Sequence, residues 1–263
     1  MFEFHRNKEA YFQYQYLTAR DYIIPFVLKD KSKDEIRTVL EIGCGEAGVL
    51  KAFLEVGCTC VGIELSSART LLATRMHADA VASEQIAFIN RDIYAIDPDR
   101  DLKFKFDLII LKDVIEHIPD QERFIPFLRP FLNPGGVIFF GFPPWQMPFG
   151  GHQQVCRSRV LSKCPYTHLL PRSWYSGLLR LFKETPQTQK GLLEIYATGI
   201  SIERFERIIK KSGMRIVQHK FWLLNPIYQY KFGRGPFEQL GVINVIPVLR
   251  NFVTTAAYYL VRI

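Results

Sequence analysis

The sequence predicts an α/β protein built on a doubly wound, mostly parallel sheet of seven strands, with a cap inserted after the fifth strand. Short apolar runs alternate with stretches of helical spacing from residue 38 to residue 141, and a glycine-rich turn follows the first run. This regular alternation stops after residue 141 and returns at residue 201. A chain of 263 residues is long enough for one core and one cap.

Apolar runs bounded by turn residues predict the strands, and helical spacing predicts the elements between them. The aromatic-rich stretch 9–28 is expected to form one or two helices that lead into the sheet, with a break at Pro25. Further helices are expected at 49–56, 67–78, 119–132 and 202–212, the last with Ser201 as its N-cap. The seven predicted strands are 38–42, 60–63, 86–90, 106–111, 136–141, 214–222 and 256–262.

These elements predict three segments along the chain. Residues 1–141 form the α/β core with its helical lead, and residues 201–263 complete the core sheet. Residues 142–200 are rich in proline, glycine, aromatic and basic residues, and we expect them to form a substrate cap. The late apolar stretch 241–263 is interrupted by Pro247, Arg250 and Asn251, so it is expected to form core elements and no bilayer helix.

Charge and cysteine content narrow the partners and the compartment. The net charge of +8 fits nucleic acid, an anionic membrane surface or an acidic small molecule, and the excess concentrates in the cap. No basic-aromatic RNA-binding motif accompanies it, so nucleic acid is not the expected partner. Five cysteines without a CxxC pair, and no signal-like run within residues 1–8, predict reduced thiols in the cytoplasm. Peripheral membrane contact and oligomeric state stay open.

The turn at residues 41–48 is the strongest ligand signal, because it lies between a first strand and a first helix. Its glycines let a ligand approach the backbone. A dinucleotide-binding fold uses the same spacing, which leaves an NAD-dependent oxidoreductase as an alternative. Glu41 favours another ligand, because a carboxylate here repels pyrophosphate and attracts the α-ammonium of a methionyl group, whose own carboxylate then meets loop amides.

Two acidic residues extend this site along the edge of the sheet. Glu64 ends the second strand and is placed to accept hydrogen bonds from two ribose hydroxyls. Asp92 follows the third strand, where it can accept a hydrogen bond from an adenine amino group while Ile93 flanks the ring. A solvated turn aspartate is the alternative for Asp92.

Residues 39–48, Glu64, 90–93 and 107–119 together resemble the class I methyltransferases that depend on S-adenosylmethionine (SAM), in particular the type-11, ubiquinone-methyltransferase-like branch. The resemblance covers roughly residues 38–141 and departs from the family's glycine pattern at Ala47. It implies a Rossmann-like methyltransferase fold, SAM as cofactor, and methyl transfer to oxygen or nitrogen of a small acceptor. The positive charge of the cap favours an anionic acceptor, and an acceptor linked to a glycan or lipid is a further alternative. The expected cofactor-binding residues are Glu41, Gly43, Cys44, Gly45, Gly48, Glu64, Leu65, Asp92, Ile93, Lys112 and Tyr14.

The same resemblance places the methyl-transfer site at the end of the fourth strand. Asp113 is then expected to border the cofactor, and His117 to face the acceptor as a general base, with pocket wall or helix cap as the alternative. His152, between glycine and glutamine pairs in the cap, is a further candidate for catalysis and substrate binding. A SAM-binding scaffold without activity and a nucleic-acid methyltransferase are the remaining alternatives.

The cap supplies the predicted substrate residues. Residues 142–145 resemble the Pro-Pro-aromatic motif of adenine-amino methyltransferases, but Phe142 cannot accept a hydrogen bond, so we expect a stiff loop that presents Trp145 to the substrate. Arg157, Arg159 and Arg172 are expected to hold an anionic acceptor, with a solvated surface as the alternative. His152, Cys156, Cys164 and His168 have a spacing too short for a standard zinc finger, so we expect no bound metal.

Overall fold

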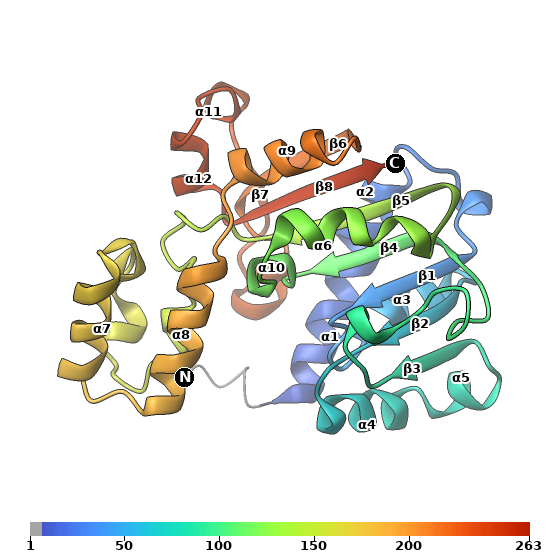
Figure 1. Cartoon of the computed structure of the whole chain (residues 1–263), viewed down its shortest axis with the longest axis horizontal. Helices are drawn as coiled ribbons and strands as arrows, with labels where there is room; N and C mark the ends of the chain where they lie inside the picture. Colours follow the sequence, from blue (N-terminus) through green and yellow to red (C-terminus); the bar gives the residue numbers. More distant parts are fainter. Residues whose placement is uncertain (1–6) are drawn as a thin grey trace.

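A computed structural model describes residues 7–263 and places eight strands in one sheet (Figure 1). Residues 1–6, which belong to the N-terminal segment considered above for a signal sequence, lie outside the described residues. The strand order is β3-β2-β1-β4-β5-β8-β6-β7. The strands are β1 (Thr38–Ile42), β2 (Thr59–Ile63), β3 (Ile86–Ile89), β4 (Phe106–Lys112), β5 (Leu132–Phe142), β6 (Arg215–Leu224), β7 (Phe237–Glu238) and β8 (Ala256–Arg262).

The mostly parallel sheet is confirmed. The strands β1 to β5 pair in parallel, whereas β8 runs antiparallel between β5 and β6. The eighth strand, β7, was not predicted, because it has two residues and pairs only with the edge of β6. β5 is longer than the predicted range 136–141, because it begins at Leu132 and extends to Phe142.

Helices cover both faces of this sheet and largely follow the expected pattern. Ser201 caps its helix as predicted by accepting a hydrogen bond from the Arg204 N–H at 3.1 Å. Pro25 does not break the leading helix, because a π-helical stretch (Ala19–Ile23) joins α1 directly to α2, and Pro25 lies in the first turn after this change of helix type. The helices are α1 (Lys8–Thr18), α2 (Ile24–Val27), α3 (Gly48–Glu55), α4 (Ser67–Met76), α5 (Ala78–Ala82), α6 (Gln121–Phe127), α7 (Arg172–Leu181), α8 (Pro186–Thr198), α9 (Ile202–Lys211), α10 (Ile227–Phe232), α11 (Gly241–Asn244) and α12 (Leu249–Val253).

The core consists of two apolar layers, one on each face of the sheet. Along β4, Leu108 and Ile110 pack into the layer beneath α2 and α3, and Ile109 and Leu111 pack into the layer beneath α6 and α9. This alternation explains why the strand reads as a continuous apolar run, since both of its faces are buried.

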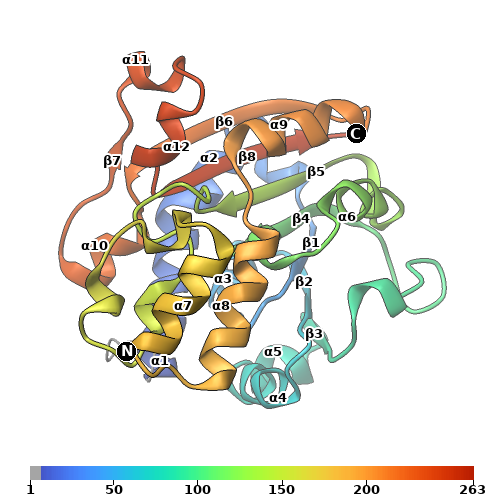
Figure 2. The ribbon, with the colours of Figure 1, turned by 60° about the vertical axis from the view of Figure 1, so that its left-hand side comes forward.

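A third, smaller apolar cluster lies within residues 142–200, where α7 and α8 pack side by side (Figure 2). Its buried members are Cys156, Leu161, Tyr175, Leu179 and Leu192. In Figure 1 the arrowheads of β1 and β4 point toward the side of the molecule that carries α7, α8 and α10. The carboxyl ends of the parallel strands, where open α/β sheets bind ligands, therefore face this segment.

The expectation that residues 241–263 form core elements holds only for part of that stretch. β8 is buried, but Val242 and Val245 in and after α11 are 68% and 77% exposed, because α11 projects beyond the sheet. Within the described part of the chain, no helix has the length and apolar character needed to span a bilayer.

Candidate cofactor and acceptor site

The glycine turn joins β1 to α3 and has a backbone that requires glycine at two positions. Gly43 and Gly45 have φ angles of +68° and +58°, a region that L-residues with side chains rarely adopt. Gly48 begins α3 so close to α1 that an added Cβ would lie 2.3 Å from the Phe12 carbonyl oxygen. The turn therefore depends on glycine for its conformation and for the approach of α1.

Most amides at the start of the turn are already used within the protein. The Gly43 and Cys44 N–H groups donate to the Ile63 carbonyl at 2.8 and 3.2 Å, and the Gly45 N–H donates to Glu64 at 3.0 Å. The Gly43, Cys44 and Gly45 amides are therefore engaged within the protein, and the expectation that loop amides meet a ligand carboxylate stays a prediction for the rest of the loop. The Cys44 side chain also points away from the turn and packs over Gly62, 2.7 Å from the position of an added Cβ.

Glu41, the penultimate residue of β1, is a buried carboxylate, and one of its oxygens has no hydrogen-bond partner in the described part of the chain. Its side chain is 2% exposed, and Oε2 accepts no hydrogen bond. Burial raises the pKa of Glu41 well above its usual value, while Arg69 and Lys112 act in the opposite direction. An unpartnered buried acceptor is costly, so this oxygen is suited to a cationic or N–H donor of a ligand.

Glu64 bridges the turn to the following loop. Its two oxygens accept hydrogen bonds from the Gly45 and Ser66 N–H groups at 3.0 and 2.8 Å. The Arg69 guanidinium lies across Gly45 and contacts Glu46 at 3.1 Å and Glu64 at 3.6 Å. Arg69 places a positive charge over the turn that the sequence pattern did not indicate.

The remaining predicted cofactor residues are spread along the same edge of the sheet. Asp92 is exposed and caps a short 3-10 turn by accepting the Tyr94 N–H at 3.0 Å, while Ile93 is buried. Leu65 is 71% exposed. On α1, Tyr11 and Gln15 line the cavity described next, but Tyr14 does not. The Gln15 Oε1 atom is buried without a hydrogen-bond partner, as is the Glu41 oxygen.

A large cavity opens beyond the turn, at the carboxyl ends of β1 and β4. Its volume is about 1090 Å³, which exceeds the roughly 300–1,000 Å³ of an ordinary small-molecule site. Its lining includes Gly43, Arg69, Lys112 and Asp113 on the core side. Lys112 forms an ion pair with Asp113, whose φ angle of +56° marks a strained backbone at the strand end. The cavity is large enough for a cofactor and an acceptor side by side.

Of the predicted substrate residues in the cap, His152 lines the cavity. Trp145 does not, because its ring packs against His168 and Tyr196 inside the cap. Arg157, Arg159 and Arg172 are exposed and also lie outside the lining. Among the basic residues of the cap, Lys163 lines the cavity and places a positive charge there.

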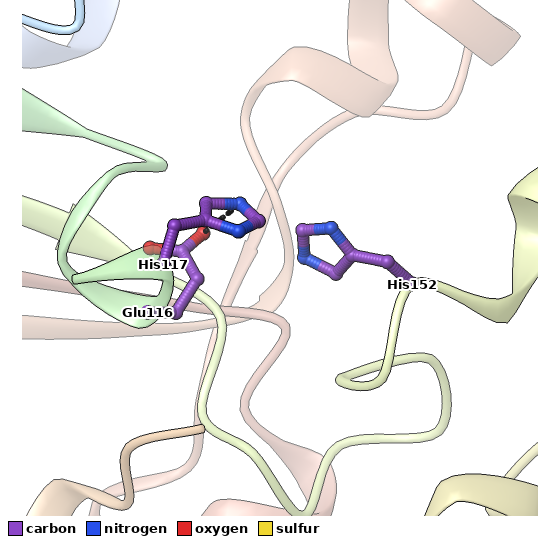
Figure 3. A group of neighbouring side chains, drawn as sticks. All are labelled: Glu116, His117 and His152. Atoms are coloured by element: carbon purple, nitrogen blue, oxygen red, sulfur yellow. Dashed lines mark ion pairs between the residues drawn. The ribbon is translucent and has the colours of Figure 1, made fainter. Parts of the chain in front are cut away.

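His117 and His152 come together although they lie in different segments. His117 belongs to the turn after β4 and His152 to the cap loop, and Figure 3 shows their imidazoles facing each other. The ring centroids are 5.0 Å apart. Burial lowers the pKa of His117, with Asp113 acting in the opposite direction, so the imidazole is neutral near pH 7. Glu116 lies beside this pair and is 2% exposed.

Helix α10 supplies lining residues that the sequence analysis missed. Tyr228, Lys231 and Phe232 come from this helix, and Arg234 follows it. Lys231 lies over the Tyr11 ring at 4.8 Å, so α10 and α1 close one side of the cavity together. Burial lowers the pKa of Lys231 to about 8. The interleaved basic and aromatic residues of 228–234 were the available signal.

A family model described as a methyltransferase domain matches residues 11–150, which is more than half of the chain. The chain belongs to this family. The matched region contains the glycine turn, Glu41, Glu64 and the end of β4. The resemblance to SAM-dependent methyltransferases is confirmed, and with it the assignment of SAM as cofactor.

Curated relatives of this chain are also named as methyltransferases. A ubiquinone biosynthesis O-methyltransferase from Pasteurella multocida is 30% identical over 110 residues, which are 40% of this chain and 45% of that protein. One from Rhodopseudomonas palustris is 30% identical over 100 residues, or 38% and 37% of the two chains. The similarity therefore spans less than half the length of these relatives.

Solved methyltransferases share the fold across nearly the whole chain. The plantazolicin methyltransferase BpumL in complex with S-adenosylhomocysteine (SAH) is 13% identical, with a TM-score of 0.52 over 98% of this chain and 86% of its own. Magnesium protoporphyrin IX methyltransferase from Synechocystis, also with bound SAH, is 14% identical, with a TM-score of 0.54 over 95% and 83%. These structures confirm the predicted methyltransferase fold.

The site residues fit the chemistry of SAM. A methionyl ammonium is a cation with N–H donors, and the turn offers the unpartnered, buried Glu41 oxygen. At positions 43 and 45 the space that a Cβ would need is filled by the Val114 and Arg69 side chains, and Arg69 thereby brings a positive charge for a carboxylate to the turn. Glu64, although it bonds the turn, keeps unused lone pairs on each oxygen for ribose hydroxyls.

The raised pKa of Glu41 predicts a pH dependence of cofactor binding. Pairing with an ammonium requires the ionised carboxyl, so binding of SAH should release a proton whenever Glu41 is protonated in the free protein. We expect affinity for SAH to rise with pH as Glu41 ionises, and the raised pKa places this rise above the usual titration range of a glutamate. Calorimetric titration in two buffers of different ionisation enthalpy counts the released protons. The substitution Glu41→Gln should abolish this release, and an affinity that falls with rising pH would contradict the assignment.

Proposed function

We propose that the protein is a SAM-dependent O-methyltransferase that acts on a small, largely apolar acceptor bearing an anionic group. The observation that carries this proposal is the juxtaposition of the Glu41 turn with a cavity that continues past His117 and His152. Oxygen is favoured over nitrogen because the curated relatives are named O-methyltransferases. Bound SAM supplies an electrophilic methyl group on its sulfonium, and the protein contributes alignment and exclusion of water.

Residues of this chain divide the cavity between the two ligands. We infer that Glu41 binds the methionyl ammonium, Arg69 binds its carboxylate and Glu64 binds the ribose. Asp113 and Lys112 border the junction between cofactor and acceptor. Residues 142–200 then act as the cap over the acceptor, with His117 and His152 beside the reacting oxygen.

The lining of the cavity beyond the glycine turn supports an acceptor with an apolar body and an anionic group. Its apolar wall is formed by Met147, Phe149, Val155, Tyr228 and Phe232. Lys163, Lys231 and Arg234 add three basic groups to this wall. An acceptor with an apolar body and one carboxylate or phosphate matches this lining, and its anion would favour the charged form of Lys231.

Methyl transfer to simple phenols tests the proposal. Purified protein is incubated with SAM labelled in its methyl group and with a panel of phenols and catechols that either carry or lack a carboxylate. We expect label in the ether product, with higher kcat/KM for the carboxylated members. Label recovered only from amine acceptors, or none from any acceptor although SAH binds, would contradict O-methyl transfer to this class.

Charge reversal at the cavity wall should change acceptor binding selectively. Lys163→Glu and Lys231→Glu are each expected to raise KM for a carboxylated phenol roughly tenfold, because attraction becomes repulsion in a partly desolvated site. KM for SAM and for a neutral phenol should stay within about twofold. Lys190→Glu, an exposed cap residue outside the lining, is the matched control. Equal KM for the carboxylated phenol in all three variants would remove the proposed anion site.

A further inference from the structure

Glu116, His117 and His152 form a cluster of side chains that can act as metal ligands. One donor atom from each residue can be chosen so that all three lie within 4.8 Å of one another. Figure 3 shows Glu116 and His117 projecting from the turn after β4, while His152 approaches from the cap loop on the opposite side. Two imidazoles and one carboxylate form a common donor set for a divalent transition metal.

The buried Glu116 carboxylate is the second, independent observation that points to a bound cation. Its side chain is 2% exposed, yet neither Oε1 nor Oε2 has a hydrogen-bond partner among the described residues. The His117 Nε2 atom, 4.0 Å from Oε1, is too distant for a hydrogen bond. A buried carboxylate without hydrogen-bond donors is costly, and a divalent cation at this position would neutralise it more completely than the distant His117 ring.

The backbone on the core side of the cluster is fixed by buried hydrogen bonds. The Gln121 side chain donates to the Ile115 carbonyl at 2.8 Å and to the Thr198 carbonyl at 2.7 Å. The Thr198 hydroxyl donates to the Glu116 carbonyl at 2.6 Å. The turn that carries Glu116 and His117 is thereby tied to the end of α8, which gives the rigid support that a ligand pair requires.

The backbone around His152, on the cap side of the cluster, is also fixed by buried hydrogen bonds. His152 has a φ angle of +58°, a strained conformation for a residue with a side chain. The next residue, Gln153, is fully buried and donates to the Pro148 carbonyl at 3.0 Å and to the Cys164 carbonyl at 3.3 Å. Strain that is stabilised by a buried neighbour is typical of a residue placed for function.

We propose that Glu116, His117 and His152 bind one divalent transition-metal ion of the Zn²⁺ class, which holds and activates the acceptor oxygen. This inference rests on the proposed methyl transfer for its role, although the metal site stands on its own geometry. Bonds of about 2.0–2.2 Å to the three donors require the donor atoms to approach to roughly 3.4 Å, closer than the 4.8 Å within which they lie here, so metal binding would draw them together. The sequence analysis expected no bound metal, because the spacing within the cap does not show that His152 meets residues of the turn after β4. The proposal differs from that expectation.

The ion would act on the acceptor as a Lewis acid. By lowering the pKa of an acceptor hydroxyl held at this site, the ion would favour the deprotonated, nucleophilic oxygen, with the proton released to solvent before methyl transfer. The oxygen lone pair then forms the new bond to the methyl carbon as the carbon–sulfur bond breaks, and the sulfonium becomes a neutral thioether. In this scheme His117 and His152 are ligands, and no general base is required.

Metal binding is tested with tag-free protein stripped by a chelator. Zn²⁺ affinity is measured by competition with a chromophoric chelator, and Co²⁺ is added alone to record its ligand-field absorption. We expect one ion per chain, and Glu116→Gln and His152→Ala should each weaken Zn²⁺ binding at least about tenfold. His219→Ala, which removes an exposed histidine of β6, is the matched control and should bind normally. A Cys164→Ser background removes the exposed thiol as a competing ligand.

Two further readouts separate this inference from folding defects and from the proposed function. Because the Glu116 carboxylate is buried without a hydrogen-bond partner among the described residues, Glu116→Gln without metal should melt at the same temperature as the wild type or higher. SAH affinity, measured by calorimetry, should be unchanged in both ligand variants. Wild-type protein that binds no stoichiometric ion, or variants that bind it as tightly, would overturn the metal site. Metal binding without SAH binding would instead overturn the proposed methyl transfer and leave the site intact.

Discussion

Glu41→Gln is expected to weaken SAH binding roughly 30- to 150-fold, the equivalent of about 2–3 kcal/mol. Glutamine has nearly the same shape and keeps an acceptor oxygen, but it removes the negative charge that pairs with the methionyl ammonium. The unpartnered Oε2 atom is the group that loses its function. The affinity is measured by calorimetric titration with SAH at a fixed pH.

The control for Glu41→Gln is the same glutamate-to-glutamine change at a surface position. Glu84 is exposed and pairs only with Lys103, so Glu84→Gln should leave SAH affinity within about twofold. The melting temperature of Glu41→Gln without ligand should not fall, because the carboxylate it replaces is buried and incompletely paired. Unchanged SAH affinity in the Glu41 variant would remove the charge pairing on which the cofactor site depends.

Gly48→Ala is expected to destabilise the protein by about 1–3 kcal/mol, because the new methyl group would meet the Phe12 carbonyl oxygen at 2.3 Å and displace α1. For a chain of this size the melting temperature should fall by about 3–10 °C. SAH binding should weaken as well, since α1 carries the lining residues Tyr11 and Gln15. Thermal unfolding followed by circular dichroism, together with calorimetric titration, measures both effects.

A glycine-to-alanine substitution in an open part of the structure should increase stability instead of lowering it. Gly177 lies inside α7, and an added Cβ there meets no atom within 4 Å. Gly177→Ala should therefore stabilise the protein by up to about 1 kcal/mol through the higher helix propensity of alanine. If both variants shifted the melting temperature equally, close packing of α1 on the turn would not be the reason for glycine at position 48.

The fold was largely predictable because its strands are buried on both faces. The range 256–262 was predicted with the bounds that β8 has, and the run 38–42 likewise became β1. The helix start predicted at Ser201 followed the expected capping chemistry. Short elements without an apolar pattern, such as β7 and α10, could not be predicted, since neighbours distant in the sequence hold them in place.

The site was predictable where one segment contains the chemistry and unpredictable where two segments meet. Glu41 and the turn glycines lie within a few residues, so their spacing alone indicated a ligand. The pairing of His117 with His152, and the position of Arg69 over Gly45, depend on packing between separate elements. Charge counting located basic residues in the cap but could not show that Arg157 and Arg159 face away from the cavity while Lys163 lines it.

Equilibrium titration of the wild-type protein with SAH and, in a separate experiment, with NAD⁺ tests the central claim most directly. That claim is that the Glu41 turn receives the methionyl end of SAM at the mouth of the acceptor cavity. The account predicts saturable binding of one SAH per chain and no saturable binding of NAD⁺, whose pyrophosphate would meet the Glu41 carboxylate. Saturable binding of NAD⁺ together with no measurable affinity for SAH would contradict it.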